Sequence, residues 1–216
     1  MKILFLCPYD DARADAVLRR VRADGDDITK TTARLSPTEA ARYDLGIVYG
    51  YEHLLPPEIL AVCRFVNLHI SYLPWNRGDI PNVWSWIDHT PKGVSIHLID
   101  NGIDTGPIYC QSLVTMDGNE TLTSSYKKLG DAMNLLFANN WSGIRNGDLV
   151  PVEQSDRGTI HTLRDRSQIA HILENGWDIP VSNLEDYAAE VGMSAQFWQQ
   201  SEAEIEALRT KKKLSK

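Results

Sequence analysis

The sequence predicts an α/β protein: a Rossmann-like, mostly parallel sheet with helices on both faces, followed by a small, mainly helical C-terminal appendage. Two observations favour this fold. Short apolar runs suited to buried strands alternate with segments of helical spacing through the first 150 residues, as expected when helices connect parallel strands. Beyond a short linker near residues 149–154, the composition changes. We therefore expect a main domain over residues 1–150 and an appendage over residues 151–216.

The first strand and the first helix are predicted at the N-terminus. Residues 2–7 form a compact apolar run. A helix is expected to begin near Asp11, because Val17 and Val21 then share one buried stripe. The corner between them, which holds Tyr9, is where open α/β sheets bind ligands. This corner lacks a glycine-rich phosphate loop, so neither a dinucleotide site nor a P-loop site is predicted.

Two short helices and two further strands follow. Ser36 precedes a proline and suits the N-cap of a short helix. A second short helix is expected after Pro56. The apolar runs at residues 45–48 and 65–70 are typical of buried strands.

The main domain is predicted to end in a long helix. Strands are expected over residues 94–99 and 107–114, behind a tryptophan-rich helix. Trp84 and Trp86 would face different directions on that helix, so at least one belongs in the core. The amphipathic segment that begins at Thr121 should pack on the sheet. Three further helices are predicted in the appendage, at residues 166–174, 182–191 and 194–211.

A cluster of polar side chains is expected where two neighbouring strands end. Asn67 and His69 are two positions apart near the end of one strand, so their side chains lie on one face. Asp104 follows the next strand. An amide and an imidazolium can stabilise the oxyanion that forms when an amine attacks a carbonyl carbon, and a carboxylate can orient the imidazole and relay the proton. The three residues therefore predict acyl-type transfer to an amine.

The same region carries a family resemblance. The matching residues are Asn67, His69, Ser71, Leu73, Pro74, Arg77, Gly78, Gly93-Val94-Ser95-Ile96 and Gly102-Ile103-Asp104-Thr105-Gly106. This pattern, strongest over about residues 43–112, resembles the 10-formyltetrahydrofolate-dependent formyltransferases. The stretch HISYLPWNRG, with PNVWSW, Gly158-Thr159-Ile160-His161 and Gly176-Trp177-Asp178, is most similar to the sugar N-formyltransferases. Residues 1–150 would then be the formyltransferase catalytic domain.

The resemblance implies a reaction and the residues that perform it. The expected reaction transfers a formyl group from 10-formyltetrahydrofolate to the amine of a nucleotide-linked amino-deoxy sugar, in a pathway to surface polysaccharide. Asn67, His69 and Asp104 would be the catalytic trio. The folate ring would lie in an apolar slot between two loops, beside His53, Leu54, Leu55 and Asp100.

The substrate residues suggested by the sequence are Tyr9, Trp75, Asn76 and Arg77. Trp75 can stack on a base or sugar while the Arg77 guanidinium meets phosphate. Alternatively, Trp75 packs on its own loop and Arg77 braces the turn by bonding carbonyls. His161 is expected to lie outside the site.

Other activities of the family fit less well. A methionyl-tRNA formyltransferase is expected to carry a further nucleic-acid-binding domain, and a glycinamide ribonucleotide formyltransferase a Gly/Ser-rich phosphate loop where this chain has Cys7-Pro8-Tyr9-Asp10-Asp11. Hydrolysis of formylfolate and a non-catalytic folate-binding module are further alternatives. The sugar, its amine position and the nucleotide are not predicted. Homodimers are frequent in the family that the chain resembles, but the oligomeric state is not predicted from the sequence.

Bulk properties exclude several classes of protein. The formal charge of −7 argues against a nucleic-acid partner. The chain has no eighteen-residue apolar stretch and no signal-peptide pattern, so we expect a cytoplasmic protein that does not bind membranes. The 3 cysteines and 6 histidines show no metal-ligand spacing, so no metal is predicted.

Overall fold

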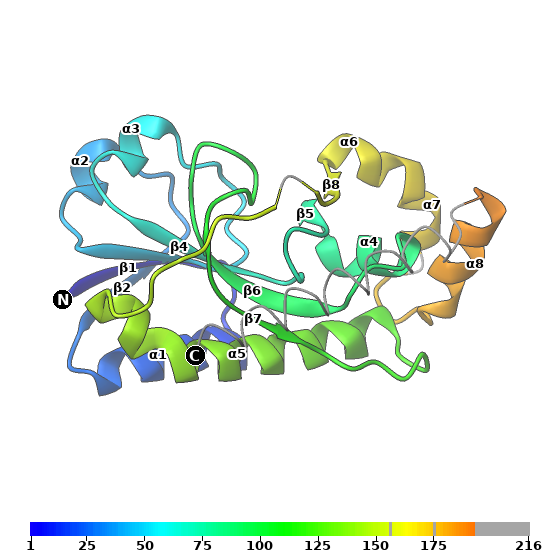
Figure 1. Ribbon diagram of the computed structural model, residues 1–216, viewed down its shortest axis with the longest axis horizontal. Coiled ribbons are helices and arrows are strands. Elements are labelled where there is room, and N and C mark those ends of the chain that lie inside the picture. Colours follow the sequence, from blue (N-terminus) through cyan, green and yellow to red (C-terminus); the bar gives the residue numbers. More distant parts are fainter. Residues whose placement is uncertain (156, 175, 193–216) are drawn as a thin grey trace.

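A six-stranded sheet crosses the molecule in the computed structural model, which describes residues 1–155, 157–174 and 176–192. The strand order is β2-β1-β3-β4-β6-β7 (Figure 1). The strands are β1 (Lys2–Leu6), β2 (Asp27–Thr31), β3 (Leu45–Val48), β4 (Phe65–His69), β6 (Gly93–Leu98) and β7 (Ile108–Leu113). The first four strands in this order are parallel, whereas β6 and β7 run antiparallel to their neighbours. The Rossmann-like sheet is confirmed, with an antiparallel edge and with β2 as a strand that was not predicted.

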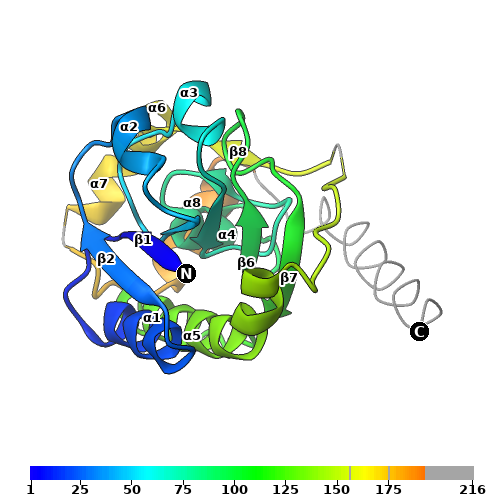
Figure 2. The ribbon, with the colours of Figure 1, turned by 90° about the vertical axis from the view of Figure 1, so that its left-hand side faces the viewer.

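Helices cover both faces of the sheet, as predicted. The helices α1 (Ala12–Ala23) and α5 (Leu122–Asn146) lie on one face, and α2 (Pro37–Ala40) and α3 (Pro57–Leu60) lie on the other (Figures 1 and 2). The residues at which these helices were predicted to begin act as their N-caps. Asp11, Ser36 and Thr121 each accept a hydrogen bond from a backbone amide of the first turn. The α5 helix ends at Gly147, whose φ of 80° is left-handed.

Two apolar cores fix which side chains of β4 face which way. Val66 and Leu68 belong to the core under α1 and α5, whereas Phe65 belongs to the core under α2 and α3. Because successive side chains of a strand alternate between faces, Asn67 and His69 lie on the same face as Phe65. That face is covered here by loops rather than by a helix (Figure 1). It is where the candidate site forms.

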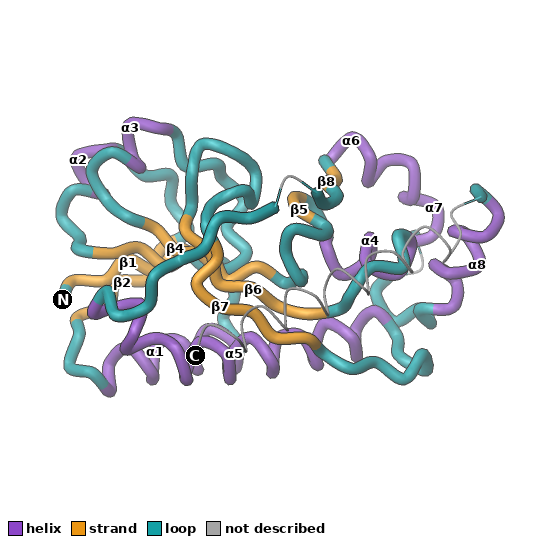
Figure 3. The backbone as a smooth tube through the Cα atoms, viewed as in Figure 1, coloured by secondary structure: helices purple, strands orange, loops and turns teal. Residues whose placement is uncertain are grey.

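A third core joins the appendage to the main domain. The helix α4 (Pro81–Ile87) buries both Trp84 and Trp86, at 5% and 3% exposure, against α8 (Ser182–Glu190). Of the predicted appendage helices, 182–191 is confirmed by α8, and 194–211 lies outside the described residues. The predicted helix 166–174 is broken into short pieces, which are α6 (Leu163–Arg166), a 3-10 turn η1 (Ser167–Ile169) and α7 (Ala170–Leu173), shown in Figure 3.

A small second sheet ties the appendage to the loop after β4. The strands β5 (Arg77–Gly78) and β8 (Ile160–His161) pair in parallel. Gly78 has a φ of 89°, and a Cβ atom there would lie 2.1 Å from the His161 carbonyl oxygen. A glycine is therefore required at this close approach. Within the described part of the chain, no helix has the length and apolar character needed to span a membrane.

Candidate active site

The structure brings Asn67, His69 and Asp104 together. The Asn67 amide nitrogen lies 3.0 Å from Asp104 Oδ1, and His69 Nδ1 lies 3.5 Å from Asp104 Oδ2. They come together in a different way from the one predicted, in which the two strands ended side by side. Because β4 and β6 are antiparallel, the end of β6 lies beside Val66 and Asn67 and not beside the end of β4. The loop at residues 99–106 then returns along the sheet and delivers Asp104 to both side chains.

His97 is a fourth member of this group, which sequence reasoning missed. It lies directly opposite Asn67 in the strand register. His97 Nδ1 is 2.8 Å from the Leu98 carbonyl oxygen, which only accepts, so Nδ1 carries the hydrogen. His97 Nε2 is therefore free to accept from the Asn67 amide at 3.2 Å. The two hydrogens of that amide are thus held by Asp104 and His97.

The ring of His69 has a defined orientation. Its Nε2 lies 3.0 Å from the carbonyl oxygen of Asn76. A carbonyl cannot donate, so Nε2 carries the hydrogen, and Nδ1 faces the Asp104 carboxylate. Burial lowers the pKa of His69, although the attraction of Asp104 opposes this shift. His69 is therefore neutral at pH 7, with one lone pair directed at Asp104.

Asp104 is held as a carboxylate. Burial alone would raise its pKa, but the positive charge that His69 and His97 carry when they are protonated, and a 2.8 Å hydrogen bond from the Gly78 amide, together lower the pKa well below its usual range. Its backbone φ of 51° is left-handed. The Gln154 side chain donates to the carbonyl oxygens of Asp104 and Gly106, both at 2.8 Å, and so braces this conformation.

The geometry gives the site two chemical capacities. The neutral His69 Nδ1 and the Asp104 carboxylate form a pair that can share one added proton. The Asn67 amide is a hydrogen-bond donor whose present acceptors can be replaced by the oxygen of a bound substrate. Among the described residues, no group of three His, Cys, Asp or Glu side chains is placed to hold a metal ion; the absence of a metal stays a prediction.

Two of the proposed substrate residues have internal roles. Asn76 is 0% exposed, and its side chain bonds to Asp88 and Thr90. Its side chain is therefore not available to a substrate. The Arg77 guanidinium donates to Gln154 Oε1 at 2.9 and 3.1 Å and braces the turn, which was the alternative reading of this residue.

The other two substrate candidates, Trp75 and Tyr9, are less buried than Asn76. Trp75 is half-buried in the same loop. Tyr9, also half-buried, packs its ring edge-to-face on Tyr49, and the Arg13 guanidinium lies 3.9 Å from the ring centroid. A Cβ atom at Gly50 would lie 2.3 Å from the Tyr9 hydroxyl. Tyr9 therefore lies against the turn after β3, where the folate residues are predicted.

The predicted folate residues lie in two loops over the α2/α3 core. Leu54 is 80% exposed, whereas Leu55 packs on the same core as Ile99. The His53 ring packs edge-to-face on Tyr51. Asp100 accepts hydrogen bonds from the Thr105 hydroxyl and the Gly102 amide, and so stabilises its own loop. Both loops thus contact the same core, and Leu54 presents an apolar surface.

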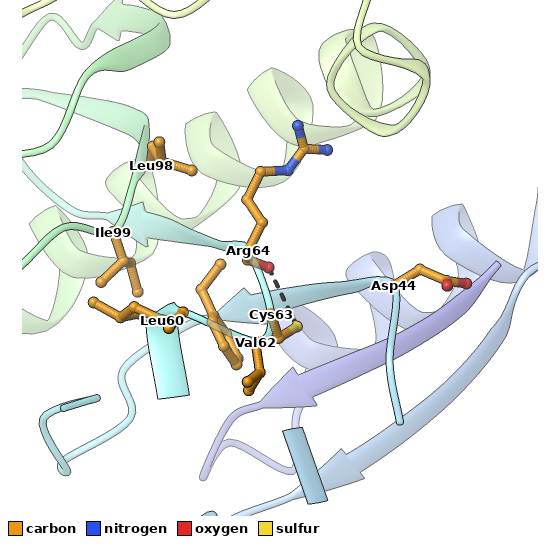
Figure 4. A pocket seen from close by; sticks show the side chains of 9 residues that line it. Asp44, Leu60, Val62, Cys63, Arg64, Leu98 and Ile99 are labelled. Carbon is orange, nitrogen blue, oxygen red and sulfur yellow. Dashed lines mark hydrogen bonds between the residues drawn. The ribbon is translucent and has the colours of Figure 1, made fainter. Parts of the chain in front are cut away.

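A surface hollow of about 380 Å³ lies elsewhere on this face (Figure 4). It is next to the residues that precede β3 and β4, and none of Asn67, His69 and Asp104 lines it. The lining residues are Asp44, Leu60, Ala61, Val62, Cys63, Arg64, Phe65, Leu98 and Ile99. The hollow is therefore separate from the carboxyl ends of β1 and β3, where Tyr9 and the turn at residues 50–55 meet.

Comparison with known proteins gives consistent matches. The family model described as Formyl transferase matches residues 27–139. A structure of the formyltransferase PseJ from Anoxybacillus kamchatkensis, in complex with UDP-4,6-dideoxy-4-formamido-L-AltNAc and tetrahydrofolate, is similar with 37% identity and a TM-score of 0.78, over 85% of this chain and 97% of that chain.

Curated relatives match over a shorter stretch. The dTDP-4-amino-4,6-dideoxyglucose formyltransferase of Mycobacterium bovis is 30% identical over 131 residues, 61% of this chain and 56% of the relative. The methionyl-tRNA formyltransferase of Lachnospira eligens is 34% identical over 116 residues, 52% of this chain and 37% of the relative. The chain thus spans from about a third to about half of the length of these curated relatives.

Proposed function

Because this chain belongs to the formyltransferase family, we propose that it transfers a formyl group from 10-formyltetrahydrofolate to the amine of a nucleotide-linked amino-deoxy sugar. The observation that carries this proposal is the likeness to PseJ, whose structure contains a UDP-linked 4-formamido sugar together with tetrahydrofolate. These two molecules are the products that such a transfer would form. The cluster of Asn67, His69 and Asp104 supplies side chains suited to the chemistry.

The residues of the site fit a folate donor. The exposed Leu54 and the neighbouring Leu55 form an apolar edge, and the loop that contains Asp100 lies over the same core. A ring held there would approach Asn67 from the side of the turn at residues 50–55. When bound, 10-formyltetrahydrofolate supplies the formyl carbon that the amine attacks.

Asn67 acts on the developing negative charge. The hydrogen of its amide that bonds to Asp104 would move to the formyl oxygen and stabilise the charge that collects there. Removing one such donor typically costs about a hundredfold to a thousandfold in kcat. His97 keeps the second hydrogen in place and so fixes the direction of the first.

His69 and Asp104 act on the proton. As the new bond forms between the amine nitrogen and the formyl carbon, the amine loses a proton, which Asp104 Oδ2 and His69 Nδ1 take up together. The imidazolium that this creates lies beside Asn67 and offsets the charge on the oxygen. The same pair returns the proton to the folate nitrogen as its bond to the formyl carbon breaks.

Mass spectrometry of a panel of acceptors tests the proposal. The protein is incubated with 10-formyltetrahydrofolate and nucleotide-linked 3-amino and 4-amino sugars, with glycinamide ribonucleotide and methionyl-tRNA alongside. The expected result is the gain of one formyl group by one sugar, lost in His69→Ala. Formylation of only glycinamide ribonucleotide or tRNA, or release of formate without any amine, would overturn it. The oligomeric state, a homodimer or a monomer, is measured separately by sedimentation.

A further inference from the structure

We propose that Asn76, Asp88 and His161 are positioning residues that orient the His69 ring through a continuous chain of hydrogen bonds, an inference that rests on the proposed function. The Asn76 carbonyl oxygen accepts the hydrogen of His69 Nε2 at 3.0 Å. This bond directs Nδ1 at Asp104, which is the arrangement that proton uptake requires. The position of one peptide group therefore determines which nitrogen of His69 is available for chemistry.

The peptide at Asn76 is held in a conformation that a non-glycine residue rarely adopts. Its φ is 54°, in the left-handed region. Four hydrogen bonds fix it there. The Asn76 amide donates to the Thr159 hydroxyl at 2.9 Å, Nδ2 donates to Asp88 at 3.1 Å and to the Thr159 hydroxyl at 3.5 Å, and Oδ1 accepts from Thr90 at 2.5 Å. Such strain persists only where the surroundings determine it strongly.

Asp88 links Asn76 to the appendage. It is 1% exposed, and its Oδ2 accepts both from Asn76 and from His161 Nε2, the latter at 2.6 Å. Its Oδ1 is buried and has no hydrogen-bond partner among the described residues. The carboxylate is therefore held entirely through one oxygen, and its position depends on both donors.

His161 is fixed on three sides. Its ring stacks on Trp84, with centroids 3.9 Å apart and planes at 4°. Its Nε2 bonds to Asp88, and its carbonyl oxygen accepts from the Asp79 amide at 2.8 Å. The appendage thus reaches the catalytic centre through the sequence His161, Asp88, Asn76, His69.

The free-energy cost of burying the Asp88 carboxylate in this hydrogen-bonded chain supports a role beyond packing. A buried carboxylate with an unpartnered oxygen is expensive, and apolar side chains of similar volume would fill the same space at lower cost. What the polar network provides, and an apolar core would not, is a fixed direction for the Asn76 carbonyl. That carbonyl contacts the catalytic histidine.

The test uses the full chain and two substitutions of His161. In His161→Phe, the stacking on Trp84 remains but the donor to Asp88 is lost. In His161→Gln, the amide nitrogen restores a donor at nearly the same place. We expect kcat to fall about 10- to 100-fold in His161→Phe with KM within about twofold, and to recover at least partly in His161→Gln. The control is His171→Phe, an exposed histidine of the same appendage, which should behave as wild type.

The second readout needs no substrate. Nitrogen-15 NMR of the histidine rings should show His69 as a single tautomer with hydrogen on Nε2 in the wild type, and as a mixture in His161→Phe. Unchanged kcat and an unchanged His69 spectrum in His161→Phe would overturn the proposal, as would a His161→Gln protein no better than His161→Phe. If the wild type transfers no formyl group, the proposed function fails while the spectrum still tests the orientation.

A substitution at the peptide itself covers the case in which His161→Phe does not fold. Asn76→Gly keeps the carbonyl and adopts a φ of 54° without strain, but it loses the side-chain bonds to Asp88 and Thr90. The same mixture of His69 tautomers is expected. A His69 spectrum identical to that of the wild type would contradict the role of the Asn76 side chain.

Discussion

Replacing Asp104 by asparagine separates the charge of this residue from its shape. Asp104 accepts from Asn67 through one oxygen and from the Gly78 amide through the other. Asparagine has only one oxygen, so its NH₂ group must face one of these two donors. The unsatisfied donor is expected to cost about 1–3 kcal/mol of stability. A domain that is stable by about 5–15 kcal/mol remains largely folded after this loss.

The expected loss of activity is larger than the loss of stability. Without the carboxylate, the amine proton has no acceptor pair, and a positioned general base is typically worth about 10²–10⁴ in rate. At 1.36 kcal/mol for each tenfold step, this is a barrier increase of about 2.7–5.4 kcal/mol. The initial rate of formyl transfer, measured by mass spectrometry at saturating donor and saturating acceptor and divided by the enzyme concentration, gives kcat. Urea unfolding of the same sample gives the folded fraction.

A matched control measures the effect on kcat of an Asp→Asn substitution outside the site. Asp131 is on the exposed side of α5 and pairs with Lys127, so Asp131→Asn should leave kcat unchanged. Turnover in Asp104→Asn within about threefold of the wild type would refute the role assigned to the carboxylate.

The pH dependence of the free energy of unfolding gives a second check. The lowered pKa of Asp104 means that its contribution to stability is present above about pH 4 and is lost as the pH falls, so the stability difference between the two proteins should shrink toward pH 3.

Three further predictions concern His97, Glu120 and Gly46. His97→Phe should lower kcat at least about tenfold, because Asn67 loses an acceptor that fixes its amide; an unchanged rate would contradict this. Glu120 is buried, which would raise its pKa, but a lysine and three backbone amides lower it to about 2. Its contribution to stability should therefore be lost as the pH falls from about 4.3 toward 2, and Glu120→Gln should unfold with a weaker pH dependence over that range; equal dependence would contradict this. Gly46→Ala places a Cβ atom 2.0 Å from the buried Phe65 ring, so urea unfolding should show a loss of about 1–3 kcal/mol, and equal stability would contradict the packing.

Local signals in the sequence predicted most of the elements. The strand of residues 65–70 and the caps at Asp11 and Thr121 depend on side chains and backbone groups within a few positions, so they can be read without knowing the fold. The strand β2 was not predicted because it has no such local signal. Its sequence, DITKT, carries no apolar run, and it forms because it pairs with β1 at the edge of the sheet.

The grouping of Asn67, His69 and Asp104 was predictable from the sequence, but the hydrogen bonds around these side chains were not. Asn67, His69 and Asp104 were identified from their spacing and from a family resemblance. The part played by His97 depends on a register in which β6 is antiparallel to β4, and the strand direction is not visible in the apolar pattern. The internal role of Asn76 depends on its left-handed backbone and on partners 12 and 83 positions away in the sequence. No local pattern carries that information.

The pairing of β5 with β8 has a consequence for the order in which the protein assembles. It joins Arg77 to Ile160, with α4, β6, β7 and α5 in the intervening chain. Contacts of such long sequence separation carry a large loop-closure cost and tend to form late in folding. During synthesis, Asn67, His69 and Asp104 can meet once β4 and β6 have paired and the loop at residues 99–106 has folded back along the sheet. The segment that sets the direction of the His69 ring leaves the ribosome only after the whole of α5, so the final geometry of the site is reached among the last steps of folding.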